Sequence, residues 1–178
     1  MNSKKLRLLC LTAVMAAVYV GLDFLSESAS AVFGGSMKIS LSGLPVVIVA
    51  IVAGPLWGAV TGFIGELVVQ LWIYGLMPTT LLWVLPAMAR GLVMGWLFRA
   101  FKKSTHPAIL AVETVLSSVV VTLLNTVGIL IDQTIYGYST YIATLVKIPL
   151  RIATGAVSAI IFALILPIVL RSLKKYIR

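Results

Sequence analysis

Cysteine and histidine are almost absent from this chain of 178 residues, which contains one of each, Cys10 and His106. A single cysteine excludes an internal disulfide and any cysteine-rich metal site. A hydrolase needs a nucleophile and a base held together, but His106 lies beside Pro107 in a turn between apolar segments. We therefore expect neither catalytic residues nor a metal site, and we do not expect an enzyme.

Charged residues are also scarce, at 11% of the chain, and only five residues are acidic. Hydrophobic residues make up 61% of the chain, and its mean hydropathy is +1.12. A soluble domain of this size could not keep so much apolar surface from water. The composition predicts an integral membrane protein in which residues 1–178 form a single transmembrane substrate-binding domain.

Basic residues give the chain a net charge of +9. A nucleic-acid-binding protein would place them along one water-exposed face, whereas here most of them lie in three clusters at the ends of apolar segments. This distribution follows the positive-inside rule, so we expect both termini in the cytoplasm and no nucleic-acid partner. The clustered residues are Lys4, Lys5, Arg7, Arg99, Lys102, Lys103, Arg171, Lys174, Lys175 and Arg178.

Turn signals divide the apolar sequence into six segments, and the clearest are Gly54-Pro55 and the turn at 75–78. An even number of spans agrees with two cytoplasmic termini. The fold class is therefore an all-α bundle of six transmembrane helices, in which residues 23–38 form an outer segment. The predicted helices cover residues 6–25, 41–53, 55–74, 79–101, 107–132 and 141–170.

Ionisable residues at membrane depth give the main functional signal, because such a group is tolerated in hydrocarbon only if it is paired, hydrated or used. Glu66, Arg90 and Arg151 lie far inside predicted helices, about 15 Å from an end at 1.5 Å per residue. Gln70 shares a helix face with Glu66, and Lys147 shares one with Arg151. Polar groups from several helices are thus expected to meet in the outer half of the bundle.

The three cations in this group outnumber Glu66, and uncompensated positive charge favours an anionic ligand. Arginine suits a carboxylate because its planar guanidinium donates two parallel hydrogen bonds. Helix 107–132 adds a polar patch toward its outer part. The predicted substrate-binding residues are Gln70, Arg90, Asn125, Lys147, Arg151 and Trp83.

Several of these residues have a second, structural interpretation. Glu66 could pair with an arginine and lock two helices together, and Lys147 could extend to the outer surface. Trp83 is equally well placed to anchor its helix at the membrane interface or to cover a flat ligand. Glu113 could be an internal pair partner or a partner-facing group. The sequence leaves these alternatives open.

Small residues mark places where membrane helices approach closely. Pairs spaced four residues apart occur in three predicted helices, at Ala13 and Ala17, Gly58 and Gly62, and Gly91 and Gly95. The glycine pairs are expected to pack helices within the chain. The alanine pair has no polar neighbour, so it either does the same or is presented to another membrane protein.

The order of several short motifs resembles that in the substrate-binding S components of energy-coupling factor (ECF) vitamin transporters, over nearly the whole chain. The motifs are the alanine pair, residues 39–45 (ISLSGLP) and residues 53–58 (AGPLWG). Residues 124–126 (LNT) and 148–151 (IPLR) are similar to the folate-type branch. Gln70, Arg90 and Asn125 would also suit a pantothenate binder.

This resemblance implies a multi-pass protein of the prokaryotic cell membrane that binds an anionic vitamin, such as folate or pantothenate, from outside. It implies docking through Ala13 and Ala17 onto a transmembrane coupling protein that two cytoplasmic ATPases drive. ATP is then used by the partners, and this chain needs no cofactor. The sequence contains no Gly-x-x-x-x-Gly-Lys phosphate-binding motif, which agrees with this division of labour.

A self-sufficient small carrier or channel is the main alternative, since buried charges also line ion paths. The chain shows no inverted repeat of broken helices, and 178 residues is small for an autonomous carrier, although oligomerisation would remove the size objection. A purely structural membrane subunit is a third class. In such a subunit, replacing Arg90 would disturb folding and abolish no ligand binding.

Overall fold

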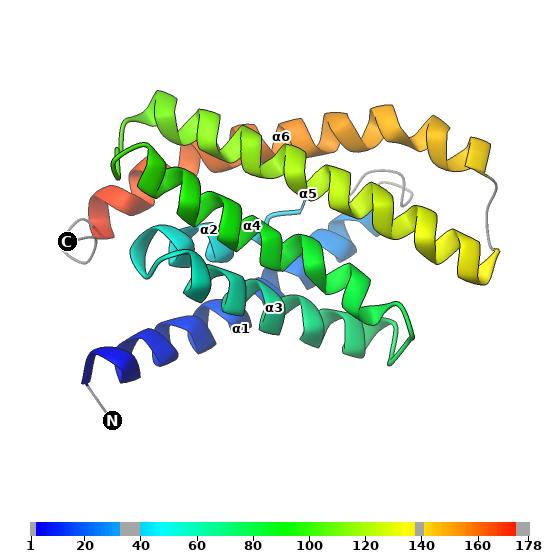
Figure 1. Cartoon of the computed structure of the whole chain (residues 1–178), viewed down its shortest axis with the longest axis horizontal. Helices are drawn as coiled ribbons and strands as arrows, with labels where there is room; N and C mark the ends of the chain where they lie inside the picture. The colour runs from blue at the N-terminus through cyan, green and yellow to red at the C-terminus, as the bar shows by residue number, and fades with distance from the viewer. Residues whose placement is uncertain (1–2, 33–39, 138–140, 174–178) are drawn as a thin grey trace.

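The computed structural model describes residues 3–32, 40–137 and 141–173, without the side chains of residues 32, 141–148, 150–151 and 173. The regular structure in this part of the chain is entirely helical (Figure 1). Five of the six predicted helices agree with the structure to within four residues at each end. The helices are α1 (Ser3–Val32), α2 (Gly43–Val52), α3 (Pro55–Ile73), α4 (Thr80–Ala100), α5 (Pro107–Tyr136) and α6 (Tyr141–Leu173).

The first helix is longer than predicted, because α1 continues beyond residue 25 through Val32, into the predicted outer segment 23–38. The hydroxyl groups of Ser26 and Ser28 each donate a hydrogen bond, of 2.8 and 2.9 Å, to the backbone carbonyl four residues earlier. Serine is compatible with a helix when its hydroxyl is satisfied in this way. The predicted end of this helix at residue 25 was therefore wrong, and residues 33–38 lie outside the described residues.

Helix α2 is much shorter than the others. Helices α1, α3, α4, α5 and α6 are long and apolar enough to cross a membrane, judged by length and composition. The 10 residues of α2 rise only about 15 Å, which is about half the thickness of the hydrocarbon layer. The prediction of an all-α membrane protein is confirmed, and α2 alone cannot account for a full crossing.

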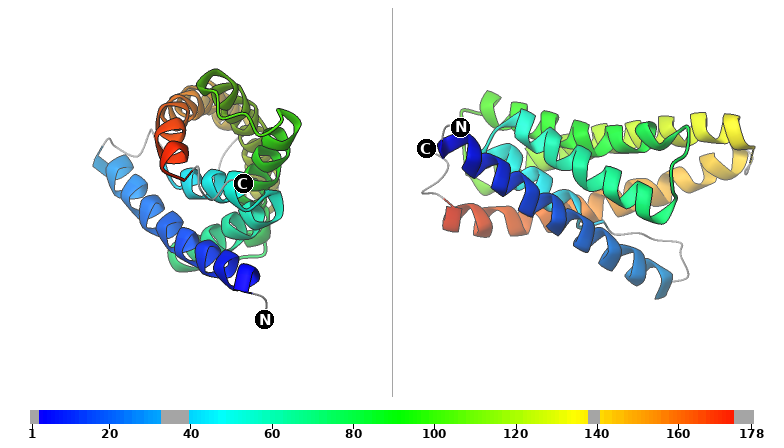
Figure 2. Two further views of the ribbon diagram at one scale, coloured as in Figure 1. Left: turned by 90° about the vertical axis from the view of Figure 1, so that its left-hand side faces the viewer. Right: turned by 90° about the horizontal axis from the view of Figure 1, so that it is seen from below.

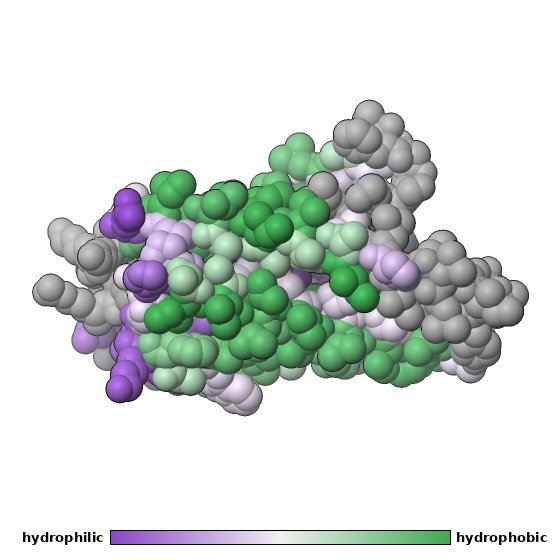
Figure 3. Space-filling model, turned by 90° about the horizontal axis from the view of Figure 1, so that it is seen from above, coloured by the Kyte–Doolittle hydropathy of each residue, from purple (hydrophilic) through white to green (hydrophobic). Residues whose placement is uncertain are grey.

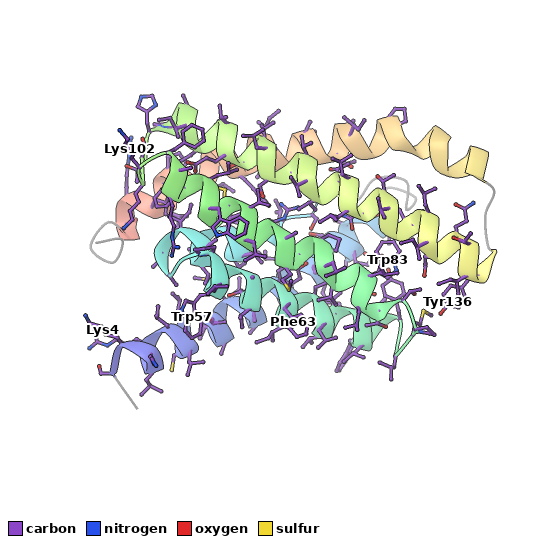
Figure 4. All side chains as sticks on the ribbon, viewed as in Figure 1. Lys4, Trp57, Phe63, Trp83, Lys102 and Tyr136 are labelled. Atoms are coloured by element: carbon purple, nitrogen blue, oxygen red, sulfur yellow. The ribbon has the colours of Figure 1, made fainter. Side chains whose placement is uncertain are left out.

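The start of α1 and the end of α6 lie at the same end of the long axis (Figure 2). Lys4 and Lys102 lie there too (Figure 4), and we call this the basic end. Figure 3 shows hydrophilic side chains gathered at this end and hydrophobic side chains over much of the face beyond it. This division suits a protein whose long axis crosses a membrane.

Helix α2 lies among the long helices and contacts α1, α3, α4 and α6. The larger apolar core forms around it, toward the basic end, where the end of α4, the start of α5 and the end of α6 come together. This core does not fill the half of the bundle that lies beyond the start of α2, away from the basic end. The buried members of this core are Val47, Ile48, Ala50, Ile51, Met94, Phe98, Leu110, Phe162, Leu166 and Leu170.

Glycines bring α3 and α4 into backbone contact. A Cβ atom added to Gly91 would overlap the backbone of Gly58, and one added to Gly62 would overlap that of Ala87. Gly95 is equally close to the start of α3. Helices can approach this closely only where a side chain is missing. The prediction that these glycine pairs pack helices within the chain is confirmed.

Candidate functional site

A hydrogen-bonded carboxylate joins α1 to α3 inside the bundle. The hydroxyl of Tyr19 on α1 donates a 2.5 Å hydrogen bond to Oε2 of Glu66 on α3. The other oxygen, Oε1, accepts a 2.7 Å hydrogen bond from Nε2 of Gln70. Tyr19 and Gln70 are buried, whereas Glu66 is partly exposed. Both oxygens of Glu66 are therefore used, as a carboxylate at membrane depth requires.

A second carboxylate, on Asp23, extends this arrangement to the start of α2. Ser42, the residue before α2, donates a 3.0 Å hydrogen bond to Oδ1 of Asp23. The hydroxyls of Ser40 and Ser42 are themselves 2.7 Å apart. The phenol of Tyr19 interacts electrostatically with both Asp23 and Ser42, which makes one continuous cluster. We call Tyr19, Asp23, Ser42, Glu66, Gln70 and Arg90 the polar cluster.

Arg90 contributes the positive charge of the polar cluster. Its guanidinium carbon lies 5.5 Å from the ring centre of Phe162, and its charge interacts with Glu66 and Tyr19. The guanidinium also lies against the start of α2, where a Cβ atom at Gly43 would come within 2.7 Å of Nη1. Among the described residues, Arg90 makes no hydrogen bond or ion pair, and its side chain is partly exposed. Its N–H groups are thus available to a ligand.

The polar cluster lies beyond the apolar core, toward the end opposite the basic end. Gly54, which precedes α3, is at the basic end beside Arg99, where its added Cβ would be 2.7 Å from Nη2. Glu66 follows Gly54 by about three helical turns, or roughly 18 Å. Val46, Val69 and Ala87 form a small buried apolar group with Tyr19. The short α2 therefore separates an apolar half of the bundle from a half that contains a polar site.

The structure brings together some of the predicted site residues. Gln70 and Arg90 both belong to the polar cluster. Trp83 is partly exposed on the first turns of α4, toward the end opposite Lys4 and Lys102 (Figure 4). Asn125 is partly exposed on α5, and within the described part of the chain no hydrogen bond joins it to the polar cluster. The roles of Trp83 and Asn125 stay predictions.

Two further predicted ligand residues, Lys147 and Arg151, lie on α6, but their side chains are outside the described part of the structure. The predicted ion pair of Glu66 with Arg90 or Arg151 stays a prediction, because the side chain of Arg151 is not described. The described hydrogen-bond partners of Glu66 are Tyr19 and Gln70, and Arg90 interacts with it through charge.

Sequence reasoning missed Tyr19, Asp23 and Ser42. A signal was present in α1, where the buried residues repeat at intervals of three or four and form one stripe along the helix. Its polar members could have indicated that the outer part of α1 faces a polar site. The buried stripe consists of Thr12, Ala16, Tyr19, Asp23, Ser26 and Ser30.

The opposite side of α1 carries the alanine pair. Ala13 and Ala17 are exposed, and so is Gly21, four residues further along the same side. A Cβ atom added to Gly21 would meet nothing within 4 Å. We call these three residues the small-residue strip. Ala13 and Ala17 thus lie at the surface of the described protein, and their presentation to another membrane protein stays a prediction.

Glu113 on α5 is fully buried, and neither of its carboxylate oxygens has a hydrogen-bond partner. The hydroxyl of Ser117, one turn later, is buried and unpartnered as well. Glu113 is therefore not paired with any described residue, and its side chain is not at the surface of this chain. Its role stays open, and we assign Glu113 no place in the site.

Comparison with protein families gives a match to the ECF-type riboflavin transporter S component over residues 3–172. Comparisons with curated proteins and with solved structures gave no match. The matched residues run from the first turn of α1 to the last turn of α6 and include the whole polar cluster. The resemblance to ECF S components is thereby confirmed, and the match is to a class of transporter subunits and not of enzymes. This chain belongs to the family of ECF-type riboflavin transporter S components, which makes it a multi-pass protein of the cell membrane.

Proposed function

We propose that the protein is the vitamin-binding S component of an ECF-type importer, that residues 1–178 form its single substrate-binding domain, and that its ligand is riboflavin. The observation that carries this proposal is the polar cluster, which joins α1, α3 and α4 inside the bundle. Arg90 at its edge is accessible and lacks a hydrogen-bond partner among the described residues. The family match supports the substrate class.

Riboflavin suits the described charges better than an anion does. It is uncharged at neutral pH and carries a flat ring system and a chain of hydroxyl groups. The polar cluster contains two carboxylates, on Asp23 and Glu66, and one cation, Arg90. Hydroxyl groups can donate to carboxylates and accept from a guanidinium. Folate or pantothenate, the expectation from the sequence, would rely on Lys147 and Arg151 to offset the two acids.

The proposed binding site lies beyond the start of α2. Helix α2 begins near the level of Asp23 and does not extend into the half of the bundle away from the basic end. In that half, the long helices therefore have no sixth helix between them in the described residues. A flat ring there would lie within reach of Arg90, with Trp83 on α4 as a candidate to cover it. Asn125, Lys147 and Arg151 remain proposed contacts from α5 and α6.

Six crossings with cytoplasmic termini form part of the proposal. Helix α1 ends far from the basic end, and α2 ends at the basic end beside α3. The chain must therefore return across the membrane between these two points, and α2 supplies the last part of that crossing. The positive-inside rule places the basic end in the cytoplasm. The vitamin then enters from the outer side.

The small-residue strip is the proposed docking surface for a transmembrane coupling protein. Ala13, Ala17 and Gly21 are exposed on one side of α1, and small side chains allow another helix to approach closely. Two cytoplasmic ATPases would supply the energy, so this chain would need no cofactor of its own. A self-sufficient carrier or channel, the alternative from the sequence, would have no use for such a surface if it acted as a monomer.

Thermal unfolding of the detergent-purified chain with riboflavin, folate or pantothenate tests the proposal. A ligand at 100 times its dissociation constant stabilises the folded protein by about 2.7 kcal/mol. We expect riboflavin to raise the unfolding temperature clearly and the other two vitamins to leave it unchanged. A loss of riboflavin fluorescence on binding would be a second signal. A shift with folate or pantothenate instead would correct the ligand. Folded protein that no vitamin stabilises would favour the carrier or channel.

A further inference from the structure

A pocket of about 400 Å³ lies at the basic end, between the turn that joins α4 to α5 and the last turns of α6. One of its lining residues, Leu170, also belongs to the apolar core around α2. That core separates the pocket from the polar cluster. The pocket is therefore a second site, which the binding of a vitamin does not use.

One wall of the pocket is polar and positively charged. It consists of Ser104, Thr105 and His106 from the turn and Arg171 from α6. Lys102 and Lys103 precede these residues in the same turn and are exposed. None of the five acidic residues of the chain lines the pocket. Its positive charge is thus not compensated from within its own wall.

The turn that forms this wall is held in a defined shape. Lys102 and Lys103 have φ angles of 54° and 56°, in the left-handed region that few non-glycine residues adopt. The N–H of Lys103 donates a 2.8 Å hydrogen bond to the carbonyl of Phe98. The hydroxyl oxygen of Ser104 accepts a 3.3 Å hydrogen bond from the N–H of His106. The 30-residue α5 starts directly after this turn, and its positive dipole end adds to the attraction for an anion.

The remaining wall is apolar and adjoins a surface that suits lipid. Pro107, Pro167 and Leu170 form this wall. Beside it on α6, the side chains of Leu164 and Ile168 are 67% and 68% exposed. A small inorganic anion would gain nothing from an apolar wall. A phospholipid would gain from the apolar wall, because its phosphate lies at the depth of the basic end and its glycerol and acyl chains continue along apolar surface.

We propose that this pocket binds the phosphate of an anionic phospholipid from the cytoplasmic leaflet. The headgroup phosphate contacts Arg171 and the hydroxyls of Ser104 and Thr105, and the glycerol region lies against Pro167. Basic pockets between membrane helices on the cytoplasmic side are suited to anionic headgroups. The proposal rests on the pocket and on its membrane depth, and it stands whichever vitamin the polar cluster binds.

Thermal unfolding of the full chain in neutral detergent, with phosphatidylglycerol, phosphatidylcholine or inorganic phosphate added, tests this proposal. We expect phosphatidylglycerol to raise the unfolding temperature, and the other two to have little effect at equal phosphate concentration. Equal stabilisation by phosphatidylcholine would overturn the preference for an anionic headgroup. Equal stabilisation by inorganic phosphate would show a free-anion site and overturn the assignment to a lipid.

Variants separate the pocket from the general charge of the basic end. Arg171→Ala should weaken the apparent affinity for phosphatidylglycerol about fivefold to tenfold. Arg7→Ala removes an exposed cation of α1 that does not line the pocket, and it should leave the affinity unchanged. Equal losses in both variants would show diffuse attraction and no site. Thr105→Trp fills the pocket without changing its charge, and an unaltered lipid response in this variant would overturn the proposal even if Arg171→Ala failed to fold.

Discussion

The hydroxyl of Tyr19 lies 2.5 Å from Oε2 of Glu66, although 47 residues separate the two in the chain. This hydrogen bond attaches the buried side of α1 to the polar cluster. The exposed side of the same helix carries the small-residue strip. Helix α1 therefore lies directly between the proposed vitamin site and the proposed docking surface.

The first prediction concerns this bond. Tyr19→Phe should lower the free energy of unfolding by about 0.6–1.7 kcal/mol, the range for side-chain hydrogen bonds between membrane helices. Thermal unfolding in detergent of Tyr19→Phe, Glu66→Gln and the double variant would measure it. We expect the double variant to lose less than the sum of the two single losses. Strictly additive losses would show that the bond contributes nothing to stability.

The second prediction concerns Arg90. Arg90→Ala should reduce riboflavin affinity by about tenfold or more, because hydrogen bonds from charged groups contribute about 1.5–3 kcal/mol each. Titration of riboflavin fluorescence would measure the loss, with circular dichroism to check the fold. Arg99→Ala, on the exposed part of the same helix at the basic end, is the matched control and should bind normally. If Arg90→Ala bound riboflavin as tightly as the control, Arg90 would have no ligand role.

Gly43→Ala tests the same site without removing its charge. The added Cβ would come within 2.7 Å of Nη1 of Arg90, so the guanidinium has to move. We expect weaker riboflavin binding in a protein that still folds. Normal binding by this variant would indicate that the position of the guanidinium against the start of α2 is not critical.

Much of the fold could be predicted because its boundaries follow local chemistry. Gly54 takes a φ of 104° and Pro55 begins α3, so one dipeptide marks both the end of α2 and the start of α3. The length of α1 could not be predicted in this way. The polar side chains among residues 23–30 favour an early end to this helix. The partners of Asp23 and Ser26 are Ser42 and Leu41, which lie in the chain before α2 and come near α1 only in the tertiary structure.

Only part of the candidate site could be predicted from the sequence. Arg90 and Gln70 stand out in sequence, since each lies deep in a long apolar segment. Asp23 lies in the predicted outer segment, so the charge count from the sequence does not include it. That count therefore overstates the positive charge near the ligand. Including Asp23 weakens the argument for an anionic vitamin and agrees with a match to a riboflavin family.

The third prediction concerns Glu113, which is fully buried and has no hydrogen-bond partner among the described residues. An unpaired charge in such a site is strongly unfavourable, so a neutral side chain of the same shape should be tolerated. Glu113→Gln should change the free energy of unfolding by less than about 1 kcal/mol, whereas Glu113→Ala leaves a cavity and should lose about 2 kcal/mol or more. Thermal unfolding would measure both. A large loss in Glu113→Gln would point to a specific partner of the acid.

The fourth prediction concerns the contact between α3 and α4. Gly91→Ala places a Cβ against the backbone of Gly58, so the two helices have to separate. Overpacking of this kind costs about 1–3 kcal/mol. Gly21→Ala is the control, since its Cβ would meet nothing within 4 Å. Thermal unfolding should show a clear loss for Gly91→Ala and none for Gly21→Ala, and equal stability of the two would contradict the close approach.

The fifth prediction separates ligand binding from transport. Ala13→Trp and Ala17→Trp add a large side chain to the exposed small-residue strip, where nothing in the described protein has to move. Riboflavin binding by the purified variants should be normal, because the polar cluster lies on the opposite side of α1. Riboflavin uptake by cells that supply the coupling protein and ATPases should be lost, because a tryptophan keeps another helix at a distance. Val18→Trp, also exposed on α1 but about 100° around the helix from Ala17, should bind and transport normally. Uptake that survived at both alanine positions would remove the strip from the docking surface. Equal failure of Val18→Trp would show that the effect is not specific to the strip.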